Sequence, residues 1–292
     1  MLKPVTLADR SMIEEYIQIN KFKNSEFNYA NWFAAQVSYN ITYIILEDCL
    51  CIVQQYDGEY QTIFPLGEKH KIKNAILALE EYFRSTLKQP FVMTCVSTQM
   101  LTMLEEFGLL QKFDVEERID LADYIVKTEN ITAMRGKKLN KIRNDFNHFT
   151  KNYKYQFLPI SKKNEKLYLD TILALIKERS SDPQKELCHT ARAILDREEL
   201  GLKSGVLYVE GKMSGLVLGQ ELHGVTLINY ARAYTNYRGV YHMMYKSLIE
   251  EHFLHLPYVN LMEDMGSKGL KQAKSSFNPE PLIPKYFLRY VC

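Results

Sequence analysis

The chain has 292 residues, of which 46% are hydrophobic and 25% are charged. This balance excludes a disordered chain, a collagen and a small disulfide scaffold, and the length predicts about two domains. The formal net charge is only +2, which excludes a uniformly basic coat for nucleic acid but leaves room for a local basic patch.

Strands and helices are expected to alternate along the first half of the chain. Runs of apolar and β-branched residues predict the strands, and Asp57-Gly58 predicts a hairpin turn between two of them. One apolar stripe predicts a helix, and Ser97 is a suitable N-cap for the next. The expected strands are 41–46, 50–56, 60–64, 91–96 and 120–126, and the expected helices are 72–83 and 98–107.

The second half repeats this order of elements. The expected strands are 153–160, 205–210, 213–219, 225–234, 258–262 and 282–291, and the expected helices are 163–178, 184–200, 239–253 and 268–275. Helices between some strands and hairpins between others indicate a mixed α/β fold. We therefore expect two similar domains, 1–132 and 153–292, joined by a linker helix at 133–152.

The termini and cysteines give no sign of export. The start lacks the apolar core of a signal peptide, and no apolar run approaches the ~20 residues of a membrane span. The five cysteines are an odd number at scattered spacing, which does not fit a disulfide framework. We expect a cytoplasmic protein without a transmembrane segment.

The linker helix carries a concentrated positive charge. Residues 135–154 contain seven Lys or Arg and one acid, and the basic residues of its first half are Arg135, Lys137, Lys138, Lys141 and Arg143. Helical spacing places Leu139, Ile142, Phe146 and Phe149 on one face, opposite a basic stripe. The stripe either binds a polyanion, such as tRNA or anionic lipid headgroups, or is solvated surface.

A second candidate site is Tyr237-Arg238-Gly239-Val240-Tyr241, where a strand turns into a helix. Gly239 permits close approach of a ligand, the free N–H groups of a helix start bind anions, and Arg238 adds a bidentate contact. These residues, with Tyr237 and Tyr241, are candidates for binding the phosphate of a cofactor. The alternative is a purely structural strand–glycine–helix turn.

Glu263 and Asp264 are the candidate catalytic residues. Adjacent carboxylates after a buried strand are well placed for proton transfer, although Asp264 is equally suited to cap the following helix. Lys271 and Lys274 on that helix extend the candidate polyanion-binding set. His252 and His255 lack a third ligand nearby, so we expect no metal site.

Several segments together resemble one bacterial family. They are Ser25-Glu26-Phe27-Asn28 with Asn31-Trp32, Ala122-Asp123-Tyr124-Ile125, Gly136 to Asn144, Tyr237-Arg238-Gly239, Asn260 with Glu263-Asp264-Met265-Gly266, and Gly269 to Lys274 with Asn278-Pro279. The family comprises uncharacterised proteins related to the C-terminal synthase domain of phosphatidylglycerol lysyltransferases. The resemblance spans nearly the whole chain, in the same order and spacing.

This resemblance implies two tandem domains of the GNAT acyltransferase type, as in the Fem-type aminoacyltransferases. In that fold the strands before and after the anion-binding helix splay apart, here 225–234 and 258–262, and donor and acceptor meet in the gap. The chain departs from the family pattern near this gap. Leu261 and Met262 stand in place of Arg and Glu, Ala231-Arg232-Ala233 in place of Glu-Lys-Ala, and Phe277 in place of Tyr.

The expected function is transfer of an aminoacyl or acyl group to an amine or hydroxyl. The resemblance implies aminoacyl-tRNA as co-substrate, with acyl-CoA as the lesser alternative and no permanently bound cofactor. The basic helix would bind tRNA or a lipid headgroup, the latter placing the protein at the membrane periphery. The alternative from another class is a noncatalytic binding module, in which Met262 and Phe277 plug a degenerate cleft.

Overall fold

The computed structural model describes residues 1–179 and 182–291. The chain forms two compact units, Met1–Ala122 with Ile283–Cys292, here called unit 1, and Asp123–Leu282, here called unit 2. This division differs from the expected boundaries at 132 and 153. The chain leaves unit 1 at residue 122 and returns to it after residue 282, so that unit 1 is built from both ends of the sequence.

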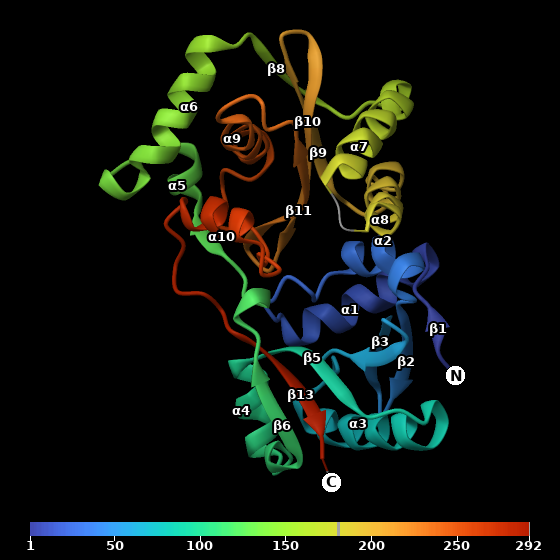
Figure 1. Ribbon diagram of the computed structural model, residues 1–292. Coiled ribbons are helices and arrows are strands. Elements are labelled where there is room, and N and C mark those ends of the chain that lie inside the picture. Colours follow the sequence, from blue (N-terminus) through green and yellow to red (C-terminus); the bar gives the residue numbers. More distant parts are fainter. Residues whose placement is uncertain (180–181, 292) are drawn as a thin grey trace. The chain divides into compact units, whose positions relative to one another are not determined.

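Unit 1 is a mixed sheet with helices on its two faces (Figure 1). Its strand order is β1-β2-β3-β4-β5-β13-β6. The strands are β1 (Lys3–Pro4), β2 (Thr42–Leu46), β3 (Cys49–Tyr56), β4 (Glu59–Thr62), β5 (Val92–Ser97), β6 (Phe113–Glu117) and β13 (Lys285–Tyr290). The helices are α1 (Arg10–Asn20), α2 (Tyr29–Tyr39), α3 (Lys69–Tyr82) and α4 (Thr98–Glu106).

Unit 2 is also a mixed sheet, with the strand order β7-β12-β11-β10-β9-β8. The strands are β7 (Ile125–Lys127), β8 (Tyr155–Pro159), β9 (Lys203–Val209), β10 (Lys212–Leu222), β11 (Val225–Ala233) and β12 (Tyr258–Asn260). The helices are α5 (Thr128–Thr132), α6 (Asn140–Asn152), α7 (Glu165–Arg179), α8 (Pro183–Leu195), α9 (Val240–His252) and α10 (Lys268–Ser275).

The helices of unit 2 lie in two layers. In Figure 1, α7 and α8 cover one face of β9, β10 and β11, whereas α5, α6 and α9 lie on the other. The buried core runs between the sheet and α9, and it includes Val217 and Ile228 of the sheet and Met244 and Leu248 of the helix. Ile142 and Phe149 of α6 are fully buried in the same core, which fixes α6 against α9.

The predicted repeat of elements is confirmed. In each unit two helices precede an antiparallel meander, which is β2-β3-β4 in unit 1 and β9-β10-β11 in unit 2. A helix then leads to a strand that runs parallel to the last strand of the meander. The predicted hairpin turn at Asp57-Gly58 has positive φ at both residues, which is the geometry that joins twisted strands with a two-residue loop.

Two expected elements differ from the structure. The expected strand at 120–126 is instead a 3₁₀ turn (Ile119–Leu121) followed by the short strand β7. The expected linker helix is broken between α5 and α6, where Met134 and Gly136 both have positive φ. A right-handed helix cannot continue through such residues, so the basic segment begins with a 3₁₀ turn (Lys137–Leu139) before α6.

The predicted C-terminal strand is confirmed, but it belongs to the first sheet. It forms β13, which pairs with β5 on one side and β6 on the other. Its first residue, Lys285, is completely buried and forms an ion pair with Glu26, while its ammonium group also donates to the hydroxyl of Ser25. A buried charge of this kind is tolerated only when it is paired, so strand β13 and the segment 24–28 depend on each other.

Candidate active site

The candidate site of unit 2 lies where strands β11 and β12 separate. The two strands pair in parallel only from Val225 opposite Tyr258 to Leu227 opposite Asn260. Strand β11 then continues to Ala233 without β12 beside it. The two strands therefore separate beyond Leu227, as the sequence resemblance implied.

A β-bulge marks the point of separation. Leu218 of β10 lies opposite Tyr230, but the next residue, Gly219, lies opposite Ile228, so Asn229 is the extra residue of β11. Bulges bend a strand and re-aim its backbone groups, and they are frequent beside active sites. At the far end of the same strand, the amide of Ala233 donates to the hydroxyl of Tyr241 at 3.2 Å.

The loop after β12 is held in one conformation by backbone bonds to the segment before β7. The amide of Leu261 donates to the carbonyl of Tyr124 at 3.0 Å, and the amide of Tyr124 donates to the carbonyl of Met262 at 3.2 Å. Met262 and Met265 both have positive φ, a strained state for non-glycine residues that persists only where the surroundings impose it. The loop is thus a rigid platform for Glu263 and Asp264.

The carboxylate of Asp264 stabilises this loop through hydrogen bonds. Its side chain is 4% exposed, and one carboxylate oxygen accepts from the amide of Gly266 at 2.8 Å. The other oxygen accepts from the hydroxyl of Tyr124 at 2.6 Å. Burial, followed by this hydrogen bond, raises the pKa of Tyr124 to about 12. Both carboxylate oxygens therefore already have a partner within the fold.

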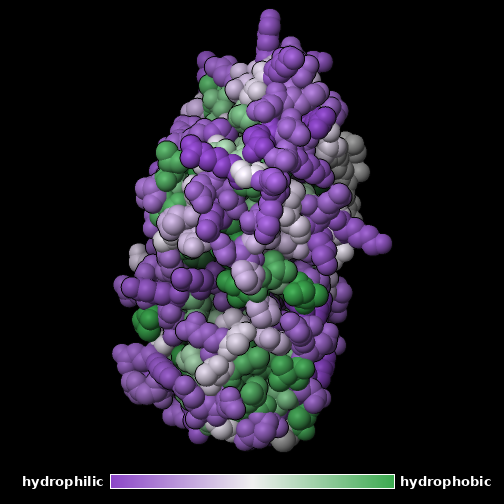
Figure 2. All heavy atoms as spheres, turned by 90° about the vertical axis from the view of Figure 1, so that its left-hand side faces the viewer, coloured by the Kyte–Doolittle hydropathy of each residue, from purple (hydrophilic) through white to green (hydrophobic). Residues whose placement is uncertain are grey.

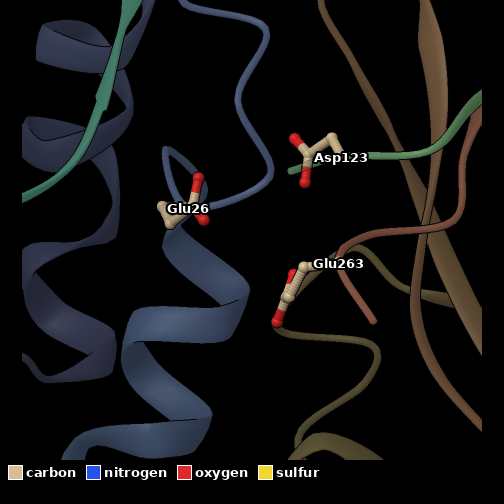
Figure 3. A group of neighbouring side chains, drawn as sticks. All are labelled: Glu26, Asp123 and Glu263. Carbon is tan, nitrogen blue, oxygen red and sulfur yellow. The ribbon is translucent and has the colours of Figure 1, made fainter. Parts of the chain in front are cut away.

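Glu263 is the carboxylate that remains for chemistry. Its backbone carbonyl accepts from the ammonium group of Lys274, but its Oε2 is buried and accepts no hydrogen bond from any residue that the structure describes. A carboxylate oxygen of Glu263 lies within 4.8 Å of one of Asp123; Figure 3 shows both side chains and the segments that carry them. The two acids therefore lie at the same end of β12.

Asp123 itself is completely buried and is oriented by Asn260. The side-chain amide of Asn260 donates to Asp123 at 3.0 Å, and its oxygen accepts from the amide of Met262 at 2.7 Å. Asn260 thus connects the end of β12, the buried acid and the Glu263 loop. The sequence resemblance includes Asp123, Tyr124 and Asn260 but assigns them no role, and only the fold shows that they support Glu263.

At the start of α9, the candidate phosphate site, the arginine forms an ion pair with a carboxylate of α6. The Nε of Arg238 lies 2.7 Å from a carboxylate oxygen of Asp145 on α6. The ring of Tyr237 packs edge-on against Tyr153, with centroids 5.2 Å apart. Gly239 has φ +91°, and a Cβ there would lie 2.4 Å from the carbonyl oxygen of Asp145, so no other residue fits. Spacing in the sequence gives no sign of this contact between α6 and α9.

The apolar replacements near the gap are mostly core residues. Leu261 and Phe277 are both buried, and Ala231 packs against the same core. The ring of Phe277 contacts His242 and Tyr245 of α9, with centroid distances of 5.2 and 6.0 Å. Phe277 therefore packs the segment after α10 against α9.

The predicted basic residues fall into two classes. Arg135, Lys137, Lys138 and Lys141 are exposed and form no ion pair with any described residue. Arg143 instead donates to the carbonyl of Met134 at 2.8 Å, which stabilises the break before α6. Figure 2 shows the face on which α6 lies, and its upper part, within unit 2, is largely hydrophilic.

Of the two lysines predicted on α10, Lys271 is exposed, whereas Lys274 contacts the carbonyl of Glu263. Lys274 therefore supports the loop that carries Glu263, and its part in polyanion binding stays a prediction. Lys271 remains a candidate for polyanion binding.

One surface cavity of about 420 Å³ lies elsewhere in unit 2. It is lined by α5 and by the segment that leads into β12, including Lys127, Leu254 and Tyr258. The Glu263 loop follows the other end of β12. We therefore locate the candidate site by its buried polar groups and not by the size of this cavity.

Comparison with known proteins identifies the family. The family model described as "Phosphatidylglycerol lysyltransferase, C-terminal" matches residues 18–289. The chain belongs to this family. A relative, an uncharacterized protein of Mycoplasmoides gallisepticum, is 27% identical over 198 residues, and the match covers 66% of this chain and 64% of that protein's length.

Solved structures show the same architecture. A conserved protein of unknown function from Bacteroides thetaiotaomicron is 26% identical and superimposes over 99% of both chains with a TM-score of 0.91. The C-terminal domain of a putative lysylphosphatidylglycerol synthetase from Agrobacterium fabrum is 12% identical, with a TM-score of 0.69 over 98% of this chain and 93% of that one.

A tandem GNAT protein from the clavulanic acid biosynthesis pathway is 9% identical, with a TM-score of 0.54 over 99% of this chain and 97% of that one. The predicted fold of two tandem GNAT-like domains is therefore confirmed. Among the described residues, no helix combines the length and apolarity needed to cross a membrane.

Proposed function

We propose that unit 2 transfers an aminoacyl group from aminoacyl-tRNA to an amine or hydroxyl acceptor. The observation that carries this proposal is the Glu263 carboxylate, which stands on a rigid loop beside the gap between β11 and β12 with an oxygen that no described residue occupies. Membership of the lysyltransferase-related family supports the same class of reaction.

In the proposed reaction the acceptor nitrogen or oxygen attacks the ester carbonyl that links the amino acid to tRNA. Glu263 removes the proton from the attacking group, and the bond to the acceptor forms. The C–O bond to the tRNA ribose then breaks, and the ribose hydroxyl leaves with the proton that Glu263 returns. Neither oxidant nor reductant is needed.

Stabilisation of the intermediate would come from the backbone at the bulge. The carbonyl oxygen becomes negatively charged on attack, and fixed N–H donors stabilise such an oxyanion well because they need no reorganisation. Strand β11 carries a bulge at Asn229 just beyond its last pair with β12, and such a bulge changes the direction of the backbone amides around it. This bulge is our candidate for the oxyanion donors.

The tRNA would be bound by the exposed cations of the segment 135–141. Lys137, Lys138 and Lys141 have no carboxylate partner among the described residues, so their charge is available to phosphates. Lys271 on α10 adds a further exposed cation. The same cations would also attract an anionic lipid headgroup, which is the alternative partner for this surface.

The test follows labelled amino acids from total aminoacyl-tRNA into added acceptors, namely phosphatidylglycerol vesicles and a mixture of small amines. We expect transfer by the wild-type protein, and Glu263→Gln should lower the rate by at least ~100-fold. The matched control is Glu251→Gln, an exposed glutamate on α9 of the same unit. Equal rates for the two variants would contradict the role of Glu263.

The same samples separate the proposal from a noncatalytic binding module. A module would bind aminoacyl-tRNA or vesicles, measured by fluorescence anisotropy or sedimentation, without any transfer above the protein-free background. Binding without transfer under all acceptor conditions would therefore replace the enzyme by the module.

A further inference from the structure

Asp145 occupies an unusual position for an acid. It is the single carboxylate between residues 135 and 154, where the sequence otherwise carries seven basic residues. It lies on α6, and its side chain is only 15% exposed. Its neighbours belong to the first turn of α9, the place at which a helix start with a glycine and an arginine would be suited to bind phosphate.

The first contact is the ion pair with Arg238. The guanidinium Nε donates to a carboxylate oxygen of Asp145 at 2.7 Å. Arg238 immediately precedes Gly239, the N-cap of α9. The cation that could hold a phosphate at this helix start therefore already has an anion beside it.

The second contact is steric. A Cβ on Gly239 would lie 2.4 Å from the carbonyl oxygen of Asp145 and 3.1 Å from the Cβ of Phe149. The backbone of α6 thus lies directly against the start of α9. Phe149 and Ile142 anchor α6 in the core, so the helix and its carboxylate are held in this position.

The third observation is electrostatic. Burial lowers the pKa of His242, in the first turn of α9, to about 4, and the negative charge of Asp145 partly opposes this shift. The carboxylate is therefore close enough for its charge to be felt in that turn. A carboxylate is stabilised by the partial positive charge at a helix N-terminus, just as a phosphate would be.

We propose that Asp145 is a specificity-determining residue whose carboxylate pairs with Arg238, the cation that a donor phosphate would need at the start of α9. The protein therefore does not select its acyl donor through a pyrophosphate group at this helix, as recognition of a CoA thioester there would require. This inference rests on the proposed acyl transfer, because it concerns the donor of that reaction, but binding and stability measurements test it without any turnover.

The experiment titrates inorganic pyrophosphate and, separately, CoA into the purified protein by calorimetry. The wild-type protein should bind neither through Arg238. Asp145→Ala removes the internal anion and should bind pyrophosphate at least ~10-fold more tightly than the wild-type protein, a change of ~1.4 kcal/mol. Adding Arg238→Ala to this variant should abolish the gain.

Asp170→Ala is the matched control, because Asp170 is exposed on α7 and its loss changes the net charge equally without altering the start of α9. Asp145→Asn keeps the size and the acceptor for Arg238 while removing the charge, so it tests the electrostatic part alone. Circular dichroism establishes which variants are folded. If Asp145→Ala does not fold, the pyrophosphate affinity of Asp145→Asn tests the inference in its place.

Two results would overturn the inference. One is wild-type binding of pyrophosphate or CoA that Arg238→Ala removes, since the site would then be open. The other is folded Asp145 variants that bind pyrophosphate no better than Asp170→Ala. Neither result depends on transfer from aminoacyl-tRNA, so failure of this inference is distinguishable from failure of the proposed function.

Discussion

The two units have the same succession of elements, but they differ around their pair of parallel strands, which are β4 and β5 in unit 1 and β11 and β12 in unit 2. In unit 1 the parallel strands β4 and β5 meet only at Thr62 and Met93, and the chain after β4 turns back onto β3. Leu66 exchanges two backbone hydrogen bonds with Leu50, at 2.8 and 2.9 Å. Phe64, two residues after β4, is completely buried here.

Unit 2 carries polar groups where its parallel strand β12 ends. Asn260 and Asp123 are buried and hydrogen-bonded to each other, and Glu263 stands beside them. Burying such groups stabilises a fold much less than burying apolar ones, because each must be compensated by a partner. Unit 1 thus buries a large apolar side chain directly after β4, whereas unit 2 holds a carboxylate in a defined position directly after β12.

The largest expected effect is the loss of stability when the buried apolar side chain of unit 1 is removed. Phe64→Ala removes a buried ring that packs edge-on against Phe22, and it should lower the free energy of unfolding by ~3–5 kcal/mol. Chemical denaturation monitored by circular dichroism measures this loss. The rate that depends on Glu263 should be unchanged at temperatures where the variant is folded, and a selective loss of that rate would contradict the division of roles.

A smaller loss of stability is expected when a hydrogen bond of the polar groups in unit 2 is removed. Tyr124→Phe removes the hydrogen bond to Asp264 and should cost ~1.5–3 kcal/mol of stability near neutral pH, because the acceptor is charged. The pKa of Tyr124 is about 12 in the fold, above its ordinary value of 10.0. A raised pKa means that the stabilising contribution is complete below pH 10 and is lost as the pH rises towards 12.

The measurement for Tyr124 is the difference in unfolding free energy between wild-type and variant proteins as the pH is raised. We expect a constant difference up to about pH 10 and a decline above it. Comparison with the variant removes the contribution of lysines, which titrate in the same range in both proteins. A difference that stays constant to pH 12 would show that the hydroxyl is not held in its neutral form.

The smallest effect concerns surface charge, which also distinguishes the units. Lys69 and Lys71 of unit 1 form ion pairs with Glu106 and Asp48, whereas the cations of the segment 135–141 have no such partner among the described residues. The joint change of Lys137, Lys138 and Lys141 to Ala should weaken tRNA binding and make its dependence on log salt less steep by about two to three.

The control for this triple variant is the joint change of Lys166 and Lys177 to Ala, two exposed lysines on α7. Filter binding across a range of salt concentrations gives both slopes. If the α7 variant flattened the slope as much per lysine as the triple variant, binding would depend on overall charge and not on the segment 135–141.

Much of the fold was predictable from local signals. The Asp57-Gly58 turn, the apolar stripe of α3 and the succession of helices and strands along each half follow from spacing and turn chemistry, which act over a few residues. The family resemblance supplied the tandem architecture. Gly136 was a signal for the break before α6, but positive φ at Met134, a non-glycine residue, has no sequence signature.

The candidate site was predictable only in part. The adjacent Glu263 and Asp264 were identified from their position after a buried strand, but which of them is occupied depends on Tyr124, 140 residues away in the sequence. The pairing of Arg238 with Asp145 spans 93 residues and likewise has no local signal. Contacts of this kind depend on how helices and strands pack, so they become visible only in the folded chain.

The insertion of β13 between β5 and β6 has a consequence for the order in which the protein is made. Unit 1 lacks an internal strand, and Glu26 lacks Lys285, until the ribosome has synthesised all of unit 2. At typical elongation rates of ~5–20 residues per second, that interval lasts about 10–30 s. Unit 1 therefore stays incomplete while unit 2 is made, and strands β5 and β6 lack their shared partner during this time.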